Sequence, residues 1–245
     1  MIELKFFVMS DIHSYYDEMK SALDEAGFDP NNEDHWVVTC GDHFDRGPKP
    51  LEVMRYLKSL PRKILIKGNH EQMLMDCIRR GDYYSHDLSN GTAGTVMYLA
   101  PEAAIFEEAC TISYGRVKDF VDGMVDYFET KNYIFVHSWV PLISQNGGFY
   151  YFNPNWREAS VKEWENSRWG NPYELAEQGL MPDKTVVFGH YHTSYPRSKY
   201  EGKPEFGKKA DFSIYRGQGY IGIDGCCAHS GKINVLVLED GFLEE

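Results

Sequence analysis

Short apolar runs alternate with apolar residues at helical spacing through the first third of the chain. The runs cover residues 4–9, 37–41 and 63–67 and are rich in β-branched or aromatic side chains, which is typical of buried strands. Each run leads into a polar turn and then into apolar residues three or four positions apart, which predicts an amphipathic helix. Three strand–turn–helix units in succession predict parallel strands joined by right-handed crossovers.

Four further apolar runs predict strands in the remainder of the chain. They lie at residues 133–136, 185–188, 220–223 and 233–238. The last two flank a glycine-bearing turn, so we expect them to pair as a hairpin. Because we find no linker, internal repeat or low-complexity tract, we expect one domain over residues 1–245.

Two insertions, at about 81–131 and 144–182, interrupt the alternation of strands and helices. The first opens with the polar, tyrosine-bearing stretch 83–96, which we interpret as an active-site rim. It continues into apolar residues at helical spacing up to Phe128, which predict an amphipathic helix. The second insertion is irregular and rich in Trp, Tyr, Asn and Pro, and the basic stretch 194–219 reads as a surface excursion.

Polar residues of metal-binding and phosphate-binding types follow five of the predicted strands directly. In open α/β sheets, ligands bind beyond the carboxyl ends of strands, so side chains delivered there by neighbouring strands meet. Strand by strand, the set is Asp11 and His13; Asp42, Asp45 and Arg46; Asn69 and His70; His137; and His190 and His192. One such histidine alone is most often a core or surface residue, but repetition at five strand ends indicates a site.

The composition of this set predicts two bound divalent cations. Asp, His and Asn without a thiolate suit manganese, iron, zinc or nickel, with manganese our first expectation, and do not suit a structural zinc site. The set holds more ligands than one ion needs, so we expect two ions about 3.5–4 Å apart that share a carboxylate. Asp42, on the middle strand, is the expected bridge. A cation held by a carboxylate beside Arg46 makes a phosphate site.

The formal net charge of −12 excludes a basic groove for nucleic acid, and bound cations reconcile it with a phosphate ligand. No run of about 18 apolar residues occurs, so we expect no membrane span. Residues 1–5 carry no basic region or cleavage site, so we expect no secretion signal. The five cysteines, odd in number and without CxxC spacing, favour a reducing cytoplasm. The sequence indicates no particular oligomeric state.

Five motifs together resemble the signature of calcineurin-like metallophosphoesterases. They are Asp11-Ile12-His13, Gly41-Asp42-His43-Phe44-Asp45-Arg46-Gly47, Gly68-Asn69-His70-Glu71, Val136-His137 and Gly189-His190-Tyr191-His192. The Asp-Arg-Gly and Asn-His-Glu elements resemble the phosphoprotein phosphatase branch, which includes bacterial and phage serine/threonine phosphatases and symmetrical diadenosine tetraphosphate hydrolases. The resemblance implies an α/β fold in which a two-sheet β-sandwich is flanked by helices (α/β/β/α), with the metal site at the strand carboxyl ends.

The resemblance also implies a role for each matching residue. The two ion sites share Asp42: Asp11, His13 and Asp42 would hold the first ion, joined by His192 as in the wider superfamily, and Asp42, Asn69, His137 and His190 the second. Arg46 and Asn69 would bind phosphate oxygens, and His70, oriented by Asp45, would protonate the leaving alkoxide. A metal-bridging hydroxide would attack phosphorus in line, with no phosphoenzyme intermediate.

Some positions depart from the family pattern or leave alternatives. Ser14 and Ser138 stand where small residues are commoner, and neither change removes a ligand. His43 lies inside the second motif, where we interpret it as a rim residue. The second phosphate-binding arginine of the family matches Arg168 best and Arg157 next, and a solvated arginine without a role is the third possibility.

These features predict a metal-dependent phosphatase for phosphomonoesters. Phosphoserine and phosphothreonine in proteins are the expected substrates, with phosphotyrosine as an extension. The nearest alternative is a symmetrical dinucleoside polyphosphate hydrolase, which would take a nucleotide at the same metal pair. A non-catalytic metal-binding regulatory module is a more distant alternative, because a pure binder needs neither the acid His70 nor its partner Asp45.

Overall fold

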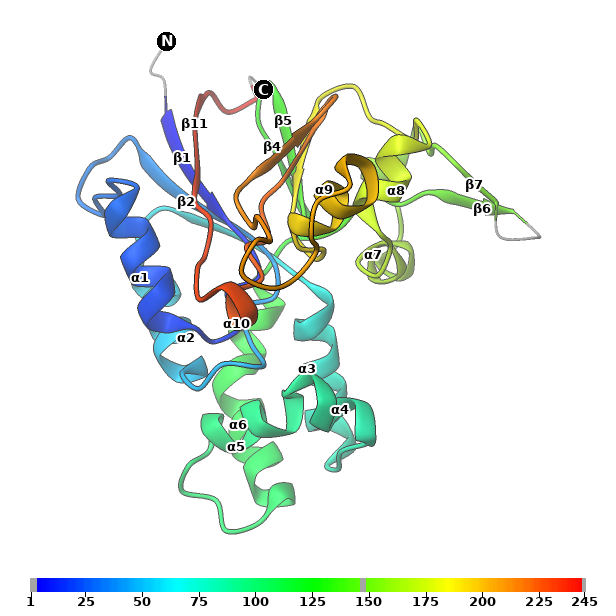
Figure 1. Cartoon of the computed structure of the whole chain (residues 1–245). Coiled ribbons are helices and arrows are strands. Elements are labelled where there is room, and N and C mark those ends of the chain that lie inside the picture. The colour runs from blue at the N-terminus through cyan, green and yellow to red at the C-terminus, as the bar shows by residue number, and fades with distance from the viewer. Residues whose placement is uncertain (1–3, 146–148, 244–245) are drawn as a thin grey trace.

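The computed structural model describes residues 4–145 and 149–243, in which two mixed sheets pack face to face (Figure 1). The first sheet has the order β11-β1-β2-β3. Its strands β1 (Leu4–Met9), β2 (His35–Cys40) and β3 (Lys63–Ile66) are parallel, and β11 (Leu236–Asp240) runs antiparallel to β1. The three parallel strands and the helices that follow them confirm the strand–turn–helix units predicted from the sequence.

The second sheet has the order β4-β5-β8-β10-β9. Its strands are β4 (Tyr127–Glu129), β5 (Tyr133–Val136), β8 (Thr185–Phe188), β9 (Tyr215–Gly217) and β10 (Tyr220–Gly222). Strands β5, β8 and β10 are parallel, and β4 and β9 are antiparallel edges. A separate hairpin of β6 (Ile143–Gln145) and β7 (Phe149–Tyr151) projects from one side of the molecule (Figure 1).

The predicted closing hairpin is wrong, because its two strands belong to different sheets. Strand β10 pairs with β8 and β9, whereas β11 pairs with β1. Leu236 and Leu238 are buried between the sheets, while Val237 between them is 40% exposed. This alternation suits a sheet edge with one covered face. The sequence shows this amphipathic pattern but does not say which edge the strand joins.

Alternation of side chains along β1 divides the core into layers. Phe6 and Val8 lie between the two sheets and share a cluster with Phe135 of β5. Phe7 and Met9 point to the opposite face, where they pack against helices. A third cluster covers the outer face of the second sheet with side chains from the second insertion. The order is therefore helices, sheet, sheet, helices, which confirms the predicted α/β/β/α fold class.

Helices cover both outer faces of the sandwich (Figure 1). The first face carries α1 (Tyr16–Glu25), α2 (Pro50–Ser59), α3 (Asn69–Arg80), α5 (Thr92–Leu99) and α6 (Phe106–Asp122), and α4 (Ser85–Asn90) packs against α5. The second insertion adds a 3-10 helix (Trp156–Glu158), α7 (Val161–Ser167) and α8 (Pro172–Glu177); α9 (Ser194–Glu201) and α10 (Cys227–Ser230) follow later. No helix in the described ranges is long and apolar enough to cross a membrane.

The stretch 83–96, interpreted as an active-site rim, forms α4 and much of α5 and borders a predicted site residue, since Thr92 Oγ1 donates to Asp45 Oδ2 at 2.6 Å. Two other predictions need correction. The amphipathic helix of the first insertion ends at Asp122, so Phe128 belongs to β4 and contributes to the inter-sheet core. The stretch 194–219 is also more regular than a surface excursion, since it contains α9 and the edge strand β9.

Candidate metal centre and active site

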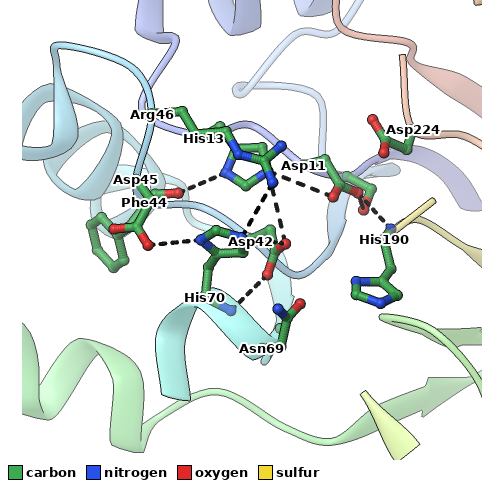
Figure 2. Close-up of polar contacts among 12 residues, drawn as sticks. Asp11, His13, Asp42, Phe44, Asp45, Arg46, Asn69, His70, His190 and Asp224 are labelled. Carbon is green, nitrogen blue, oxygen red and sulfur yellow. Dashed lines mark hydrogen bonds and ion pairs between the residues drawn. The ribbon is translucent and has the colours of Figure 1, made fainter. Parts of the chain in front are cut away.

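The turns that follow the parallel strands of both sheets are tied to one another by backbone hydrogen bonds. Asp11 N donates to Gly41 O at 3.1 Å, which joins the turns after β1 and β2. Gly189 N donates to His137 O at 2.9 Å, which joins the turns after β8 and β5. Across the sandwich, His190 N donates to Asp11 Oδ2 at 2.9 Å. Predicted site residues of these turns, among them Asp11, Asp42, His70 and His190, therefore meet at one end of the two sheets (Figure 2).

Left-handed backbone conformations are concentrated in these turns. The described residues include eight non-glycine residues with positive φ, a conformation that strains an L-residue. Two of them are Ser14 and Cys226. The other six are predicted site residues: Asp11, His13, Asp42, Asp45, Arg46 and His190. Such strain clusters where side chains must be aimed in one direction, so its location supports a functional site.

Glycines in the motifs allow the turns to approach one another closely. A Cβ added to Gly68 would lie 2.1 Å from Asp42 Oδ1, and one added to Gly189 would lie 2.1 Å from Asp11 Oδ2. Both distances are far below a van der Waals contact. The glycines that precede Asn69 and His190 therefore leave room for the carboxylates of neighbouring turns.

The carboxylate of Asp42 lies at the centre of the site, with one oxygen toward each of two groups of side chains. Oδ2 is 3.8 Å from His13 Nε2, and Oδ1 is 3.4 Å from His137 Nε2. Oδ1 also accepts a hydrogen bond from His70 N at 3.0 Å. Burial opposes the ionisation of Asp42, but in acid, where their rings are protonated, His137, His70, His13 and His190 outweigh burial and hold the pKa of Asp42 far below its usual range.

The first group consists of Asp11, His13 and Asp42. His13 Nδ1 lies 2.9 Å from Phe44 O, and a carbonyl only accepts, so Nδ1 carries the proton and Nε2 a lone pair. Nε2 is buried, has no hydrogen-bond partner among the described residues, and lies 3.8 Å from Asp11 Oδ1. Burial, then Arg46 and His70, lower the pKa of His13 and keep the ring neutral.

The second group consists of Asp42, Asn69, His137 and His190. His137 Nδ1 donates to Cys40 O at 2.8 Å, so its Nε2 also presents a lone pair. That Nε2 lies 2.8 Å from Asn69 Oδ1 and 3.2 Å from His190 Nδ1. Burial and then His137 lower the pKa of His190 to about 3, and burial lowers that of His137. Both rings are therefore neutral at physiological pH.

Both groups fit divalent cations. Electron-pair donors converge in each of them, an arrangement that is repulsive unless a cation binds between the donors. Imidazole and carboxylate oxygen are ligands for manganese, iron, zinc and nickel, and imidazole must be neutral to bind. The hydrogen bonds from His13 to Phe44 O and from His137 to Cys40 O fix the rings in the tautomer that metal binding requires.

A histidine with a carboxylate partner stands beside the first group. His70 Nδ1 donates to Asp45 Oδ2 at 2.7 Å, and Thr92 Oγ1 donates to the same oxygen at 2.6 Å. His70 Nε2 lies 3.4 Å from Arg46 Nη2 and 3.9 Å from Asp42 Oδ2. Burial opposes the charged ring, but Asp42 and the hydrogen bond to Asp45 outweigh it and raise the pKa of His70. The Nε2 atom can thus carry a proton toward a bound substrate.

A buried network beneath Asp42 was missed by sequence reasoning. Glu71 is fully buried and accepts hydrogen bonds from the backbone N–H groups of Asp42, His43 and Gly68 at 3.0, 2.8 and 2.8 Å. His43 is also fully buried, between Thr39 Oγ1 at 2.6 Å and Glu71 Oε1 at 3.2 Å. The rim interpretation of His43 is therefore wrong. The signal for Glu71 was its place in the Gly-Asn-His-Glu motif.

Asp224 is a further buried carboxylate that the sequence did not single out as a site residue. It follows β10, lies on the Asp11 side of the site (Figure 2), and accepts a hydrogen bond from Cys226 N at 2.7 Å. Burial raises the pKa of Asp224 to about 6. Burial, then Asp224 and Asp42, raise the pKa of Asp11. The negative charges gathered here add to the attraction for a cation.

The structure does not bring His192 into either group. Its Nδ1 lies 2.8 Å from Ser194 Oγ, its Nε2 lies 3.5 Å from Glu205 Oε1, and its ring packs against Phe206. Both ring nitrogens are thus engaged in contacts with the segment that follows β8. His192 is therefore not among the ligands that we propose.

The two candidate arginines of the second insertion lie in different surroundings. Arg168 is 4% exposed and pairs with Asp126, while its Nε has no hydrogen-bond partner among the described residues. Arg157 lies at the surface, where it pairs with Glu129 at 2.7 Å and stacks on Trp156. Arg157 is thus held by a structural ion pair at the surface. Arg168 directly precedes Trp169, and the backbone of Trp169 forms a hydrogen bond with the ring of His190.

The fold and the site define a two-sheet α/β protein with two adjoining groups of side chains at its strand ends that could each hold a cation. The sequence model of the calcineurin-like phosphoesterase family matches residues 4–210. The chain belongs to this family, which confirms the resemblance seen in the sequence. The family implies divalent metal ions, in agreement with two sets of ligand atoms that converge among the described residues, His13 with Asp42 and His70, and Asp42 with His137 and His190.

Curated relatives match a short part of the chain. The symmetrical bis(5'-nucleosyl)-tetraphosphatase of Serratia proteamaculans is 39% identical over 70 residues, which are 28% of this chain and 24% of that protein. Serine/threonine-protein phosphatase 2 of Escherichia coli is 37% identical over 76 residues, 31% of this chain and 34% of that protein. The chain thus matches about a quarter to a third of the length of these relatives.

Solved structures resemble the whole chain at low sequence identity. A structure named as a candidate diadenosine tetraphosphatase superposes with a TM-score of 0.57 at 16% identity and covers 98% of this chain and 95% of its own. The cold-active protein-tyrosine phosphatase of a psychrophilic Shewanella gives 0.52 at 15% identity, with 96% and 75% coverage. At this identity, the likeness shows the fold alone.

Proposed function

We propose that the protein is a metal-dependent phosphoric ester hydrolase that acts on phosphomonoesters. The observation that carries this proposal is the placement of Asp42, whose two oxygens face two separate sets of neutral lone-pair donors beside the His70–Asp45 pair. The proposed ligands of the first ion are Asp11, His13 and Asp42, and those of the second are Asp42, Asn69, His137 and His190. Manganese is the expected metal for both positions.

The side chains around the two groups suit hydrolysis of a phosphate ester. When bound, two divalent cations lower the pKa of water and neutralise charge on the phosphoryl group. The Arg46 guanidinium, next to His70 Nε2, donates to phosphate oxygens in a planar geometry that a lysine cannot reproduce. Asn69 and Arg168 complete the proposed phosphate contacts. His70 Nε2 gives its proton to the leaving oxygen, and Asp45 holds the ring through Nδ1.

We propose phosphoserine, phosphothreonine or phosphotyrosine in proteins as the substrates. The local match to a serine/threonine-protein phosphatase supports this choice. The match of similar length to a symmetrical bis(5'-nucleosyl)-tetraphosphatase supports a second candidate, hydrolysis of dinucleoside polyphosphates at the same centre. We place the reaction in the cytoplasm, which the five free cysteines support. We also propose that residues 1–245 form one domain.

A substrate panel tests the proposal. The purified protein is loaded with manganese and assayed with para-nitrophenyl phosphate, a phosphoserine peptide and diadenosine tetraphosphate. We expect release of inorganic phosphate from the first two, whereas the second candidate predicts two molecules of ADP from the third. Asp42→Asn, prepared in the same way, measures contaminating phosphatase. No turnover above that background with any of the three would refute the proposed activity.

A further inference from the structure

The indole of Trp169 stays half exposed beside the proposed second ion site. The relative exposure of Trp169 is 49%. Its backbone nevertheless forms a hydrogen bond with the ring of His190, and the residue before it, Arg168, is buried. The carbonyl of the next residue, Gly170, accepts a hydrogen bond from Ser138 Oγ at 2.7 Å, which ties this segment to the turn after β5. A large aromatic side chain held at such a place without being buried is available to a ligand.

Trp169 lines two cavities. The larger one, which we call the insert cavity, has a volume of about 830 Å³ and lies among the β6–β7 hairpin, α7 and α8. Its walls include Trp169, Ile143, Tyr150, Leu175, Asn166 and Gln178. The smaller one, of about 370 Å³, lies against α3 and α4. The insert cavity is within the usual size for a small-molecule site, and such sites combine apolar walls with a few polar groups.

The charges around the insert cavity restrict what can enter it. Its lining residues include no lysine or arginine among those the structure describes. Its two carboxylates are already engaged, since Glu163 accepts hydrogen bonds from Ser160 and Glu174 pairs with Lys199. The cavity therefore offers no charge partner for a second phosphate or an acidic peptide. Apolar walls with the side-chain amides of Asn166 and Gln178 suit an uncharged planar group with hydrogen-bonding edges.

We propose that the insert cavity receives an aromatic ring of the substrate's leaving group and that Trp169 stacks on this ring. This inference rests on the proposed function, because the phosphate of the same molecule occupies the metal centre. Phosphotyrosine and nucleoside phosphates both carry a planar ring in the group esterified to the phosphate, attached directly in phosphotyrosine and through ribose in a nucleotide. Phosphoserine and phosphothreonine lack the ring, so among the proposed substrates the cavity favours those whose leaving group carries an aromatic ring, and the phosphoserine peptide is hydrolysed without this contact.

The kinetic test compares substrates that differ in the ring. Wild type, Trp169→Ala and Trp169→Phe are loaded with manganese and assayed with a phosphotyrosine peptide, the matching phosphoserine peptide and adenosine 5'-monophosphate. For each substrate the ratio of the variant's kcat/KM to that of wild type cancels the intrinsic reactivity of the leaving group. Tyr98→Ala is the control, because Tyr98 is 52% exposed on α5 and lines neither cavity.

We expect Trp169→Ala to lower kcat/KM by about 2- to 10-fold for substrates with a ring, the usual worth of an aromatic stack. Activity toward the phosphoserine peptide should not change, and Trp169→Phe should restore most of the loss. A loss confined to the tyrosine peptide or to the nucleotide identifies the source of the ring. An equal loss on all three substrates would show that Trp169 only supports Arg168 and His190, and would overturn the inference.

A binding measurement separates this inference from the proposed activity. Phenylphosphonate, which cannot be hydrolysed, is titrated into the manganese-loaded protein while tryptophan fluorescence is recorded. We expect quenching in wild type and its loss in Trp169→Phe, with the other four tryptophans as an internal background; of these, Trp139 also lines the cavity but is buried. Equal quenching in both proteins, or none in wild type, overturns the role of Trp169. Absence of turnover in the kinetic assay, with this difference intact, refutes the proposed activity alone.

Discussion

Replacement of Glu71 by glutamine tests whether one buried carboxylate holds the turns that carry the metal ligands. Oε2 accepts from Asp42 N at 3.0 Å and Gly68 N at 2.8 Å, and Oε1 accepts from His43 N at 2.8 Å. These bonds connect the turn after β2 with the turn after β3. Glutamine has the same shape, but one of its two terminal atoms becomes an NH₂ group that cannot accept from the N–H it faces.

The magnitude follows from the ionisation of the carboxylate. Burial opposes the charged form of Glu71, but the ion pair and hydrogen bond with His43 and the N–H of Gly68 outweigh it and lower its pKa to about 2. Relative to the ordinary value of 4.5, this corresponds to about 3 kcal/mol of stability at neutral pH. Glutamine resembles the protonated carboxyl and loses this contribution. Leaving one buried N–H unsatisfied costs a comparable amount, about 1–3 kcal/mol.

We therefore expect Glu71→Gln to destabilise the fold by about 3 kcal/mol, which lowers Tm by about 6–12 °C for a chain of this size. Thermal unfolding is measured with a chelator present, because ions that bind the native state would raise the apparent stability. The control is Glu163→Gln at the start of α7. Glu163 also accepts from a backbone N–H, that of Ser160 at 2.8 Å, but it is exposed, and we expect little change in Tm.

The pH dependence of stability tests the same role of Glu71 independently. The pKa of Glu71 is lower in the folded state than in the unfolded state, so its stabilising effect is fully present above about pH 5 and is lost as pH falls toward 2. The difference in stability between wild type and Glu71→Gln should be constant near neutrality and shrink below pH 4.5. A variant whose Tm lies within about 3 °C of wild type at pH 7, or a difference independent of pH, would refute the reasoning.

Four further predictions address the site directly. Asp42→Asn should lose metal from both positions and all turnover, and two tightly bound ions found by metal analysis with near-normal activity would contradict the bridging role. His70→Asn should lower kcat for alkyl phosphates by about 10²–10⁴ with metal content intact, and less for para-nitrophenyl phosphate, whose leaving group needs no proton; equal losses would remove His70 from the acid role. His192→Ala should keep both ions, and loss of one would return His192 to the ligand set. Arg168→Ala should raise KM and weaken inhibition by inorganic phosphate while Arg157→Ala changes little, and the opposite result would exchange their roles.

The sequence predicted the bounds of a strand well where the strand is a short apolar run between two polar turns. The apolar runs at 133–136 and 185–188 match β5 and β8 residue for residue, because each is a short buried run between polar turns. The partners of strands were harder to predict, as the closing pair β10 and β11 shows. An amphipathic strand fits any edge with one covered face, and the choice depends on contacts with residues distant in sequence.

The same distinction separates the site residues that could be predicted from those that could not. His137 directly follows β5 and Asp42 lies two residues beyond β2, so the ends of those strands determine where both side chains lie. His192 lies two positions beyond His190, whose backbone is left-handed, and the direction of its side chain depends on Glu205 and Phe206 in the chain ahead. Glu71 was recognised as part of a motif, but its three backbone partners become visible only when two turns are brought together.

The left-handed residues at the site explain why the turns need the hydrogen bonds to Glu71 to hold their conformation. Each non-glycine residue in this conformation costs on the order of 1 kcal/mol, less for Asp and His than for most others. Six of them together approach the net stability of an ordinary domain, about 5–15 kcal/mol. Glycine would remove the strain, but it would also remove the ligand. The turns must therefore be held by groups that bind no ion, and Glu71, which grips the backbone at Asp42 and at Gly68, is placed to do so.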